Sequence, residues 1–322
     1  PPALAQAPAP RAEGALERCE QPQQSPAPVP TAPAISSNGH SCPQRDGDTS
    51  RPRIGLALGG GGARGVAHIG VLRKLEELGI PVDCIAGTSM GSLVGGMYAA
   101  GGSIDQLERI VTETDWKRLF DDSIERRDRS FRRKQDDRDG VATIGIGLGR
   151  GKLEVSPGVM QGERVLSMFQ QETMAVATVR DFDELPIPFR AIATDLNTGE
   201  AVELGSGSLP EAMRASMSLP GIFQPVEIDG RVLIDGGIAD QVPIDTVRRM
   251  GADIVIAVDV GTPLMALGSN ASVLQVVSQL TGMLTVGNTR RATEKLGPGD
   301  VLIVPPLGNE VATGDFDKAV DA

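Results

Sequence analysis

Short apolar runs alternate along the chain with longer segments of helical periodicity. The most apolar runs predict buried strands over residues 54–58, 82–86, 189–194 and 254–260. Helical patterns follow the first two runs, over 65–78 and 92–100, and a shorter pair, 226–228 and 232–234, predicts a hairpin around Asp229-Gly230. Strands that alternate with helices predict an α/β fold, with a mostly parallel sheet covered by helices on both faces. Ligands of such sheets bind at the carboxyl ends of the strands, so the residues there are the first candidates for chemistry.

The pentapeptide Gly87-Thr88-Ser89-Met90-Gly91 directly follows the second predicted strand. Its G-x-S-x-G form is typical of a nucleophile elbow, in which flanking glycines allow a sharp strand-to-helix turn. The alternative is an ordinary turn with a hydroxyl that caps the helix. A Ser-His-Asp hydrolase on this elbow needs a later histidine, but both histidines, His40 and His68, precede Ser89. A nucleophilic Ser89 would therefore need a carboxylate base, and we interpret His68 as a packed or surface helix residue.

A glycine run, Gly59-Gly60-Gly61-Gly62-Ala63-Arg64-Gly65, follows the first predicted strand. Without Cβ atoms, the N–H groups of Gly60, Gly61 and Gly62 can approach a ligand closely, and a helix N-terminus favours an anion there. We interpret this run as an oxyanion hole, with a nucleotide-binding loop and a structural turn as the alternatives. The nucleotide interpretation expects an acidic residue at the end of the second strand, where the serine elbow stands instead. Arg64 is expected to fix the loop through backbone carbonyls, with an anionic substrate as its alternative partner.

Three aspartates, Asp195, Asp235 and Asp259, each end an apolar run and are candidate bases for Ser89. Periodicity alone does not choose among them. The two glycines of Asp235-Gly236-Gly237 would allow a tight turn and close approach to a neighbouring strand, whereas Asp195 leads into a simple turn sequence. Burial would raise the pKa of such a carboxyl group and strengthen it as a base, with no need for a metal ion.

Composition separates an N-terminal arm from the rest of the 322 residues. Ten of the 23 prolines lie in the first 50 positions, so we predict a disordered arm over 1–52 and a compact domain over 53–322. The segment Ala3-Leu4-Ala5 has the A-x-A form of a signal-peptidase site and, together with the Pro/Ala-rich arm, predicts export. The net charge of -11 and the pI near 4.8 argue against a nucleic-acid partner.

The three cysteines fall in two different settings. Cys84 lies in a predicted buried strand and is expected to be a small core residue. Cys19 and Cys42 lie in the arm and could pair in an oxidising compartment.

Two further segments have open interpretations. A basic block over 126–134 is either a solvated loop or a patch for phosphate headgroups or anionic lipid. Residues 272–286 place apolar side chains near one helical face: Val273, Val276, Val277, Leu280, Met283 and Leu284. That face suits core packing, membrane docking or a dimer contact, and we predict that it contributes to self-association.

The glycine run that ends in Arg64-Gly65, the elbow at Ser89 and Asp235-Gly236-Gly237 together resemble the patatin-like phospholipases, and the segment 215–225 is also similar to that family. The resemblance covers about residues 53–306 and implies a three-layer α/β/α fold with a mostly parallel central sheet. It implies a Ser89–Asp235 dyad, an oxyanion hole from Gly60, Gly61 and Gly62, and phospholipase A-type activity without calcium or another cofactor. Arg64, Gly65, Gly87, Gly91, Gly236 and Gly237 would support these motifs.

The Pro-rich arm is similar to that of bacterial PlpD-type (type Vd) autotransporters, in which the lipase is the passenger domain. This resemblance implies a secreted protein or one on the outer-membrane surface, with a periplasmic repeat and a β-barrel translocator beyond this chain. The expected partners are a phospholipid membrane as substrate and, through the 272–286 face, a second copy in a homodimer. Two other classes stay open: a non-catalytic module that binds phosphoinositides or other anionic lipids, and a nucleotide-binding enzyme that uses the glycine run.

Overall fold

A computed structural model describes residues 41–43, 50–119, 146–149, 152–155, 160–264, 266, 268–269 and 272–308. The basic block over 126–134 and Cys19 lie outside these described residues.

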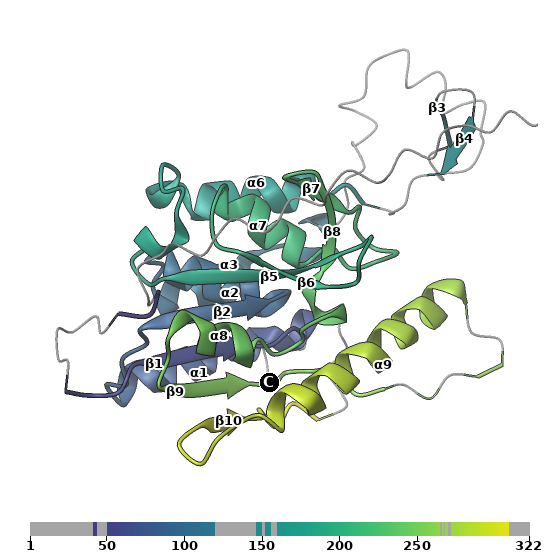
Figure 1. The fold of residues 1–322 in the computed structure, drawn as a ribbon. Helices are drawn as coiled ribbons and strands as arrows, with labels where there is room; N and C mark the ends of the chain where they lie inside the picture. Colours follow the sequence, from purple (N-terminus) through teal and green to yellow (C-terminus); the bar gives the residue numbers. More distant parts are fainter. Residues whose placement is uncertain are drawn as a thin grey trace, which may run out of the picture. The chain divides into compact units, whose positions relative to one another are not determined.

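A mixed sheet organises the described part of the chain (Figure 1), in the strand order β10-β9-β1-β2-β5-β8-β7, with β6 paired to β5. The parallel strands are β1 (Ile54–Leu58), β2 (Cys84–Thr88), β5 (Phe189–Asp195), β9 (Ile254–Val258) and β10 (Val301–Ile303). The antiparallel strands are β6 (Ala201–Leu204), β7 (Val226–Ile228) and β8 (Arg231–Asp235). A separate hairpin is formed by β3 (Ile146–Gly149) and β4 (Lys152–Val155). The prediction of a mostly parallel sheet is confirmed, although the strand that carries Asp235 runs antiparallel to β5.

Helices cover both faces of this sheet. The helices are α1 (Ala67–Glu77), α2 (Met90–Ala99), α3 (Ile104–Glu113), α4 (Trp116–Leu119), α6 (Glu163–Glu172), α7 (Leu209–Ser216), α8 (Ile244–Met250) and α9 (Val273–Thr293). Short 3-10 segments are η1 (Gly62–Val66), η2 (Met174–Val176), η3 (Phe182–Glu184) and η4 (Gly236–Ile238).

Strand alternation explains the two hydrophobic layers, because neighbouring residues of a strand face opposite sides of the sheet. On β1, Leu56 and Leu58 join a core with Leu72 of α1 and Leu93 of α2. Ala57, which lies between them, joins a second core with α8. Figure 1 shows α8 on one face of the sheet and α1 and α2 on the other. The three-layer α/β/α expectation is therefore confirmed.

A disulfide corrects the prediction for the cysteines. Cys84 at the start of β2 is bonded to Cys42, and both side chains are fully buried in the core beneath α8. Cys84 is therefore half of a crosslink rather than a simple core residue, and Cys42 is not available to Cys19. The neighbouring Ser41 hydroxyl donates a hydrogen bond to Asp183 over 2.8 Å, so the contacts of the folded domain extend upstream of residue 53.

Candidate active site

Ser89 occupies the turn between β2 and α2 in a strained conformation. Its φ of 52° and ψ of -119° lie in a region that non-glycine residues rarely adopt, as is common for functional residues on sharp turns. The flanking glycines are required because neighbouring backbone atoms lie where the Cβ of any other residue would be. A Cβ on Gly91 would lie 2.2 Å from the Leu58 carbonyl oxygen, and one on Gly87 would lie 2.4 Å from the Gly91 carbonyl oxygen. The G-x-S-x-G spacing thus packs the elbow against the end of β1.

Sheet register brings Asp235 to Ser89 across strand β5. Thr88 on β2 pairs with Ile192, and Asp235 on β8 pairs with Ala193, so Ser89 and Asp235 flank β5 at the same level. The Ser89 hydroxyl donates a hydrogen bond to Asp235 Oδ2 over 2.6 Å. A Cβ on Gly236 would lie 2.2 Å from the Ile192 carbonyl oxygen, so glycine is needed for this turn to lie against β5.

The surroundings of Asp235 suit a general base. The side chain is 5% exposed, and burial raises its pKa to about 6, while hydrogen bonds from the Ser89 hydroxyl and the Gly237 N–H oppose that rise. The Gly237 N–H donates to Oδ1 over 2.8 Å and leaves Oδ2 to Ser89. Asp235 is therefore mostly ionised at neutral pH and is a stronger base than an exposed carboxylate.

The other two candidate aspartates hold their own turns. Asp195 Oδ1 accepts from the Asn197 N–H over 2.8 Å, and Asp259 Oδ1 accepts from the Gly261 N–H over 2.8 Å. Of the three aspartates left open by the sequence, Asp235 is the one whose carboxylate contacts Ser89.

The glycine run passes directly beside Ser89, since a Cβ on Gly60 would lie 3.2 Å from Ser89 Cβ. The Gly60 N–H already donates to the Gln241 carbonyl oxygen over 3.1 Å, so it is not available to a ligand. Within the described residues, the N–H groups of Gly61 and Gly62 have no protein acceptor. The amides that can meet an anion are therefore those of Gly61 and Gly62, rather than all three that were predicted.

Arg64, Gly65 and His68 hold the glycine run in place. Arg64 donates to the carbonyl oxygens of Val260 over 3.2 Å and Gly308 over 2.8 Å, as expected for a residue that fixes the loop. A Cβ on Gly65 would lie 2.3 Å from Met90 Cγ. His68 is fully buried, which lowers its pKa to about 4, and its Nε2 lies 2.7 Å from the Gly59 carbonyl oxygen. Since a carbonyl only accepts, Nε2 carries the proton, and His68 is a packed residue of the loop support.

Two polar residues at the site were missed by the sequence analysis. Buried Gln241 donates from Nε2 to the Gly60 carbonyl oxygen over 2.6 Å, and its Oε1 would lie 2.3 Å from a Cβ on Gly237. It therefore links the glycine run to the turn after Asp235. Buried Ser216 accepts a hydrogen bond from the Ser89 N–H over 2.9 Å and donates to the Ile192 carbonyl oxygen. Ser216 had one available signal, because it lies in the 215–225 segment that resembles the family.

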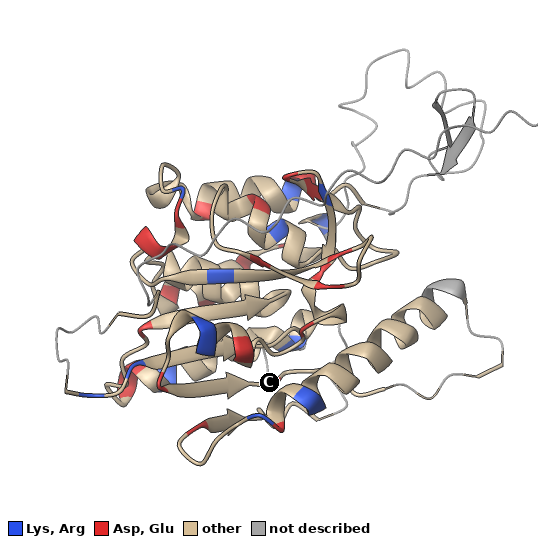
Figure 2. Ribbon diagram, viewed as in Figure 1, with Lys and Arg blue, Asp and Glu red and all other residues tan. Residues whose placement is uncertain are grey.

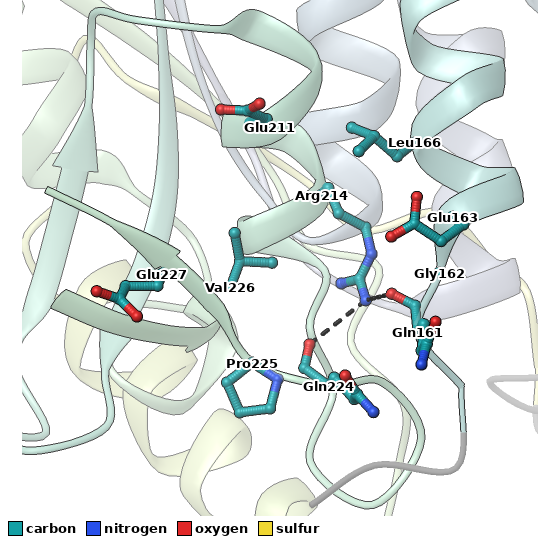
Figure 3. A pocket seen from close by; sticks show the side chains of 10 residues that line it. All are labelled: Gln161, Gly162, Glu163, Leu166, Glu211, Arg214, Gln224, Pro225, Val226 and Glu227. Carbon is teal, nitrogen blue, oxygen red and sulfur yellow. Dashed lines mark hydrogen bonds between the residues drawn. The ribbon is translucent and has the colours of Figure 1, made fainter. Parts of the chain in front are cut away.

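A separate cavity of about 480 Å³ lies among α6, α7 and β7 (Figure 3). Neither Ser89 nor Asp235 lines it. Arg214 crosses this cavity and donates to the Gln161 carbonyl oxygen over 2.8 Å and to Ser218 Oγ over 2.7 Å. The Ser218 carbonyl oxygen in turn accepts from the Asp235 N–H over 3.0 Å. Through Ser218, Arg214 thus supports the backbone at the end of β8, where Asp235 lies.

Comparisons with known proteins identify relatives of this chain. A protein of Mycobacterium bovis described as an uncharacterized NTE family protein is 38% identical over 213 residues, which are 65% of this chain and 49% of the relative. Lysophospholipase nte1 of Neurospora crassa is 26% identical over 295 residues, which are 82% of this chain and 17% of that protein. The chain thus spans about half the length of the mycobacterial relative.

Among solved structures, VipD from Legionella pneumophila is similar with a TM-score of 0.42 and 13% identity, over 83% of this chain and 66% of VipD. Residues 56–248 match the family described as patatin-like phospholipase. Because these residues make up more than half of the chain, the protein belongs to the patatin-like phospholipase family, with homologues in the NTE family.

Proposed function

We propose that this protein is a serine lipid acyl hydrolase of the phospholipase A type, which cleaves fatty-acyl esters of glycerophospholipids. The observation that carries the proposal is the 2.6 Å hydrogen bond from Ser89 to buried Asp235 on a strained elbow. A serine with an adjacent base is the arrangement that nucleophilic acyl transfer needs. The family match supports hydrolysis of lipids in general, and the substrate class is our proposal.

The reaction would proceed through an acyl-enzyme. Asp235 takes the Ser89 proton while Oγ attacks the ester carbonyl, and the new oxyanion accepts hydrogen bonds from Gly61 and Gly62. The Met90 N–H at the start of α2 is a third donor, as the residue after the nucleophile is in other elbow hydrolases. Asp235 then returns the proton to the departing lysolipid oxygen. Water, deprotonated by Asp235, attacks the acyl-serine, and Ser89 recovers its proton as the fatty acid leaves.

The alternative classes have less support. A nucleotide loop would use the amides of the glycine run, but the N–H groups of Gly59 and Gly60 donate to protein carbonyls. Asp83, the acidic residue directly before β2, forms a two-point ion pair with Arg51 at 2.6 and 2.7 Å instead. A non-catalytic lipid-binding module would give no reason for a strained serine bonded to a buried carboxylate.

Export is part of the proposal. The Cys42–Cys84 disulfide favours an oxidising compartment, in agreement with the signal-peptidase-like Ala3-Leu4-Ala5. The resemblance to PlpD-type passengers stays a prediction, because residues 1–40, most of the arm on which it rests, lie outside the described residues.

Fatty-acid release from a mixed-chain phosphatidylcholine, with EDTA present, tests the proposal in Ser89→Ala and Ser92→Ala proteins. Ser92 is the matched control because it is fully buried, lies on the helix that follows Ser89, and has a hydroxyl that meets no hydrogen-bond partner in the part of the chain that the structure describes. We expect Ser89→Ala to lose about a thousandfold or more in kcat, as for removal of other serine nucleophiles, and Ser92→Ala to keep wild-type activity within about twofold. Equal activity of the wild-type and Ser89→Ala proteins would refute the assignment.

A further inference from the structure

Helix α9 turns its apolar side chains outward. Val276, Leu280, Met283 and Leu284 are each between 44% and 56% exposed, so core packing does not explain them. Val277 is half-buried, and the side chain of Val273 lies outside the described residues. In an ordinary surface helix the apolar side chains face the core, so the exposure of these side chains on α9 needs a different explanation.

The face that α9 turns toward the domain is polar and contacts Gly237 and Ile238, in the turn that follows Asp235. Buried Asn288 donates from Nδ2 to the carbonyl oxygens of Gly237 and Ile238, over 3.2 and 2.5 Å. Half-buried Thr285 would have its methyl group 3.3 Å from a Cβ on Gly237. Gly237 is two residues from Asp235, so the inner face of α9 is attached directly beside the dyad.

The segment that includes most of α9 contains no charged residues. Residues 260–289 contain no Asp, Glu, Lys, Arg or His, although 23% of all residues are Asp, Glu, Lys or Arg. In Figure 2 the described part of the α9 ribbon is tan, the colour of uncharged residues, until the blue of the arginines near its C-terminal end. These are Arg290 and Arg291, in the last turn of the helix. A surface helix without charge is poorly suited to water and well suited to an apolar environment.

From this arrangement we infer that the outward face of α9 docks on the surface of an electrically neutral phospholipid layer. The inference rests on the proposed function and names the surface from which the site takes its substrate. An apolar helix face can enter the boundary between headgroups and acyl chains while the helix lies along the surface. A neutral layer fits the net charge of -11, which would be repelled by anionic lipid.

Lipid is favoured over a second copy of the chain by the position of the helix. Asn288 attaches α9 to the turn that follows Asp235, so a layer that binds α9 meets the helix that contacts the candidate site. If a second copy bound this face instead, its protein would cover the apolar side chains of α9 and keep a lipid layer away from them. None of the described helices combines the length and apolar content needed to cross a bilayer.

Co-sedimentation with vesicles of pure phosphatidylcholine tests the inference, in full-length protein that carries Ser89→Ala so that no lipid is hydrolysed. The test variant adds Leu280→Asp and Leu284→Asp. The matched control adds Leu78→Asp and Met174→Asp, two side chains that are 60% and 68% exposed elsewhere. We expect the α9 variant to bind vesicles at least about 10-fold more weakly, because two apolar anchors become charged, and the control to bind within about twofold of the parent.

A second, uncharged variant, Val276→Ser with Met283→Ser, should weaken binding in the same direction. With Ser89 restored, both α9 variants should hydrolyse a soluble short-chain ester as the wild type does, which shows that the fold and the dyad are intact. Unchanged vesicle binding by the α9 variants, or no binding by the parent, would overturn the inference. So would light scattering that shows a dimer of the parent and a monomer of the α9 variant with equal vesicle binding. Vesicle binding by a protein whose wild type releases no fatty acid would refute the proposed function alone.

Discussion

At the residue scale, the proposed chemistry rests on one serine on a strained turn and one buried carboxylate. Ser89 is held in a strained conformation by close-packed glycines and by the Ser216 hydroxyl that accepts its N–H. Asp235 is withdrawn from water, which raises its pKa to about 6 and makes it a better proton acceptor than an exposed aspartate. Gln241 connects the two sides of the site by hydrogen bonding to Gly60.

The pH dependence of the reaction follows from the raised pKa of Asp235. Only the ionised carboxylate can take the Ser89 proton, so kcat/KM on a soluble ester should fall as pH drops through about 6, rather than through the ordinary aspartate value near 4. A pH–rate profile of the wild-type protein measures this midpoint.

Asp240 supplies the control for that profile, since burial and the nearby Asp245 raise its pKa to about 7. Only its backbone carbonyl touches the elbow, through a hydrogen bond from the Thr88 hydroxyl. Asp240→Asn should therefore leave the midpoint near 6. A midpoint near 4 in the wild type, or one that moves in Asp240→Asn, would show that another group controls the rate.

At the element scale, motifs within one continuous stretch of sequence could be predicted. Contacts between distant stretches could not, because they depend on the order and direction of the strands. The elbow and the glycine run were predicted because both motifs lie within single strand-to-helix connections. Periodicity alone left the base open among Asp195, Asp235 and Asp259, because the choice depends on β8 running antiparallel beside β5, and it was the family resemblance that implied Asp235. Gln241 gave no signal, since a single glutamine in a loop does not show which carbonyl it will meet.

Two other elements show the same limit. The periodicity of α9 predicted an apolar face but did not decide whether that face packs in the core, docks on a membrane or contacts a second copy of the chain. The partner of Cys84 was missed because nothing in the sequence shows that residue 42 returns to the start of β2.

The Cys42–Cys84 disulfide should contribute measurably to stability. It joins residues 42 positions apart and fastens the segment before β1 to the strand that leads to Ser89. Cys42→Ser should lower the free energy of unfolding by about 4 kcal/mol, as expected for a crosslink of this span. Urea unfolding with and without a reducing agent measures the effect: reduction should destabilise the wild type and leave Cys42→Ser unchanged. An unfolding midpoint of the wild type that does not respond to reduction would contradict the crosslink.

At the scale of the whole molecule, the sheet gathers all functional parts at one edge. The glycine run follows β1, the elbow follows β2, and Asp235 ends β8 on the other side of β5. Helix α9 is attached to the same edge by Asn288, with its apolar face turned outward. The proposed lipid contact therefore lies on a helix that contacts the turn after Asp235, as suits an enzyme that acts on an assembled lipid surface.

The most direct test of this account is the rate at which an alkyl fluorophosphonate labels the protein, followed by intact mass and located by peptide sequencing. This reagent forms a covalent bond to an activated serine hydroxyl and needs no bound lipid layer. We predict a single adduct on Ser89 of the wild type, and labelling at least about 100-fold slower in Asp235→Asn, because the base that activates the hydroxyl is lost. Labelling of a different residue, or equal rates in the wild type and Asp235→Asn, would contradict the Ser89–Asp235 dyad.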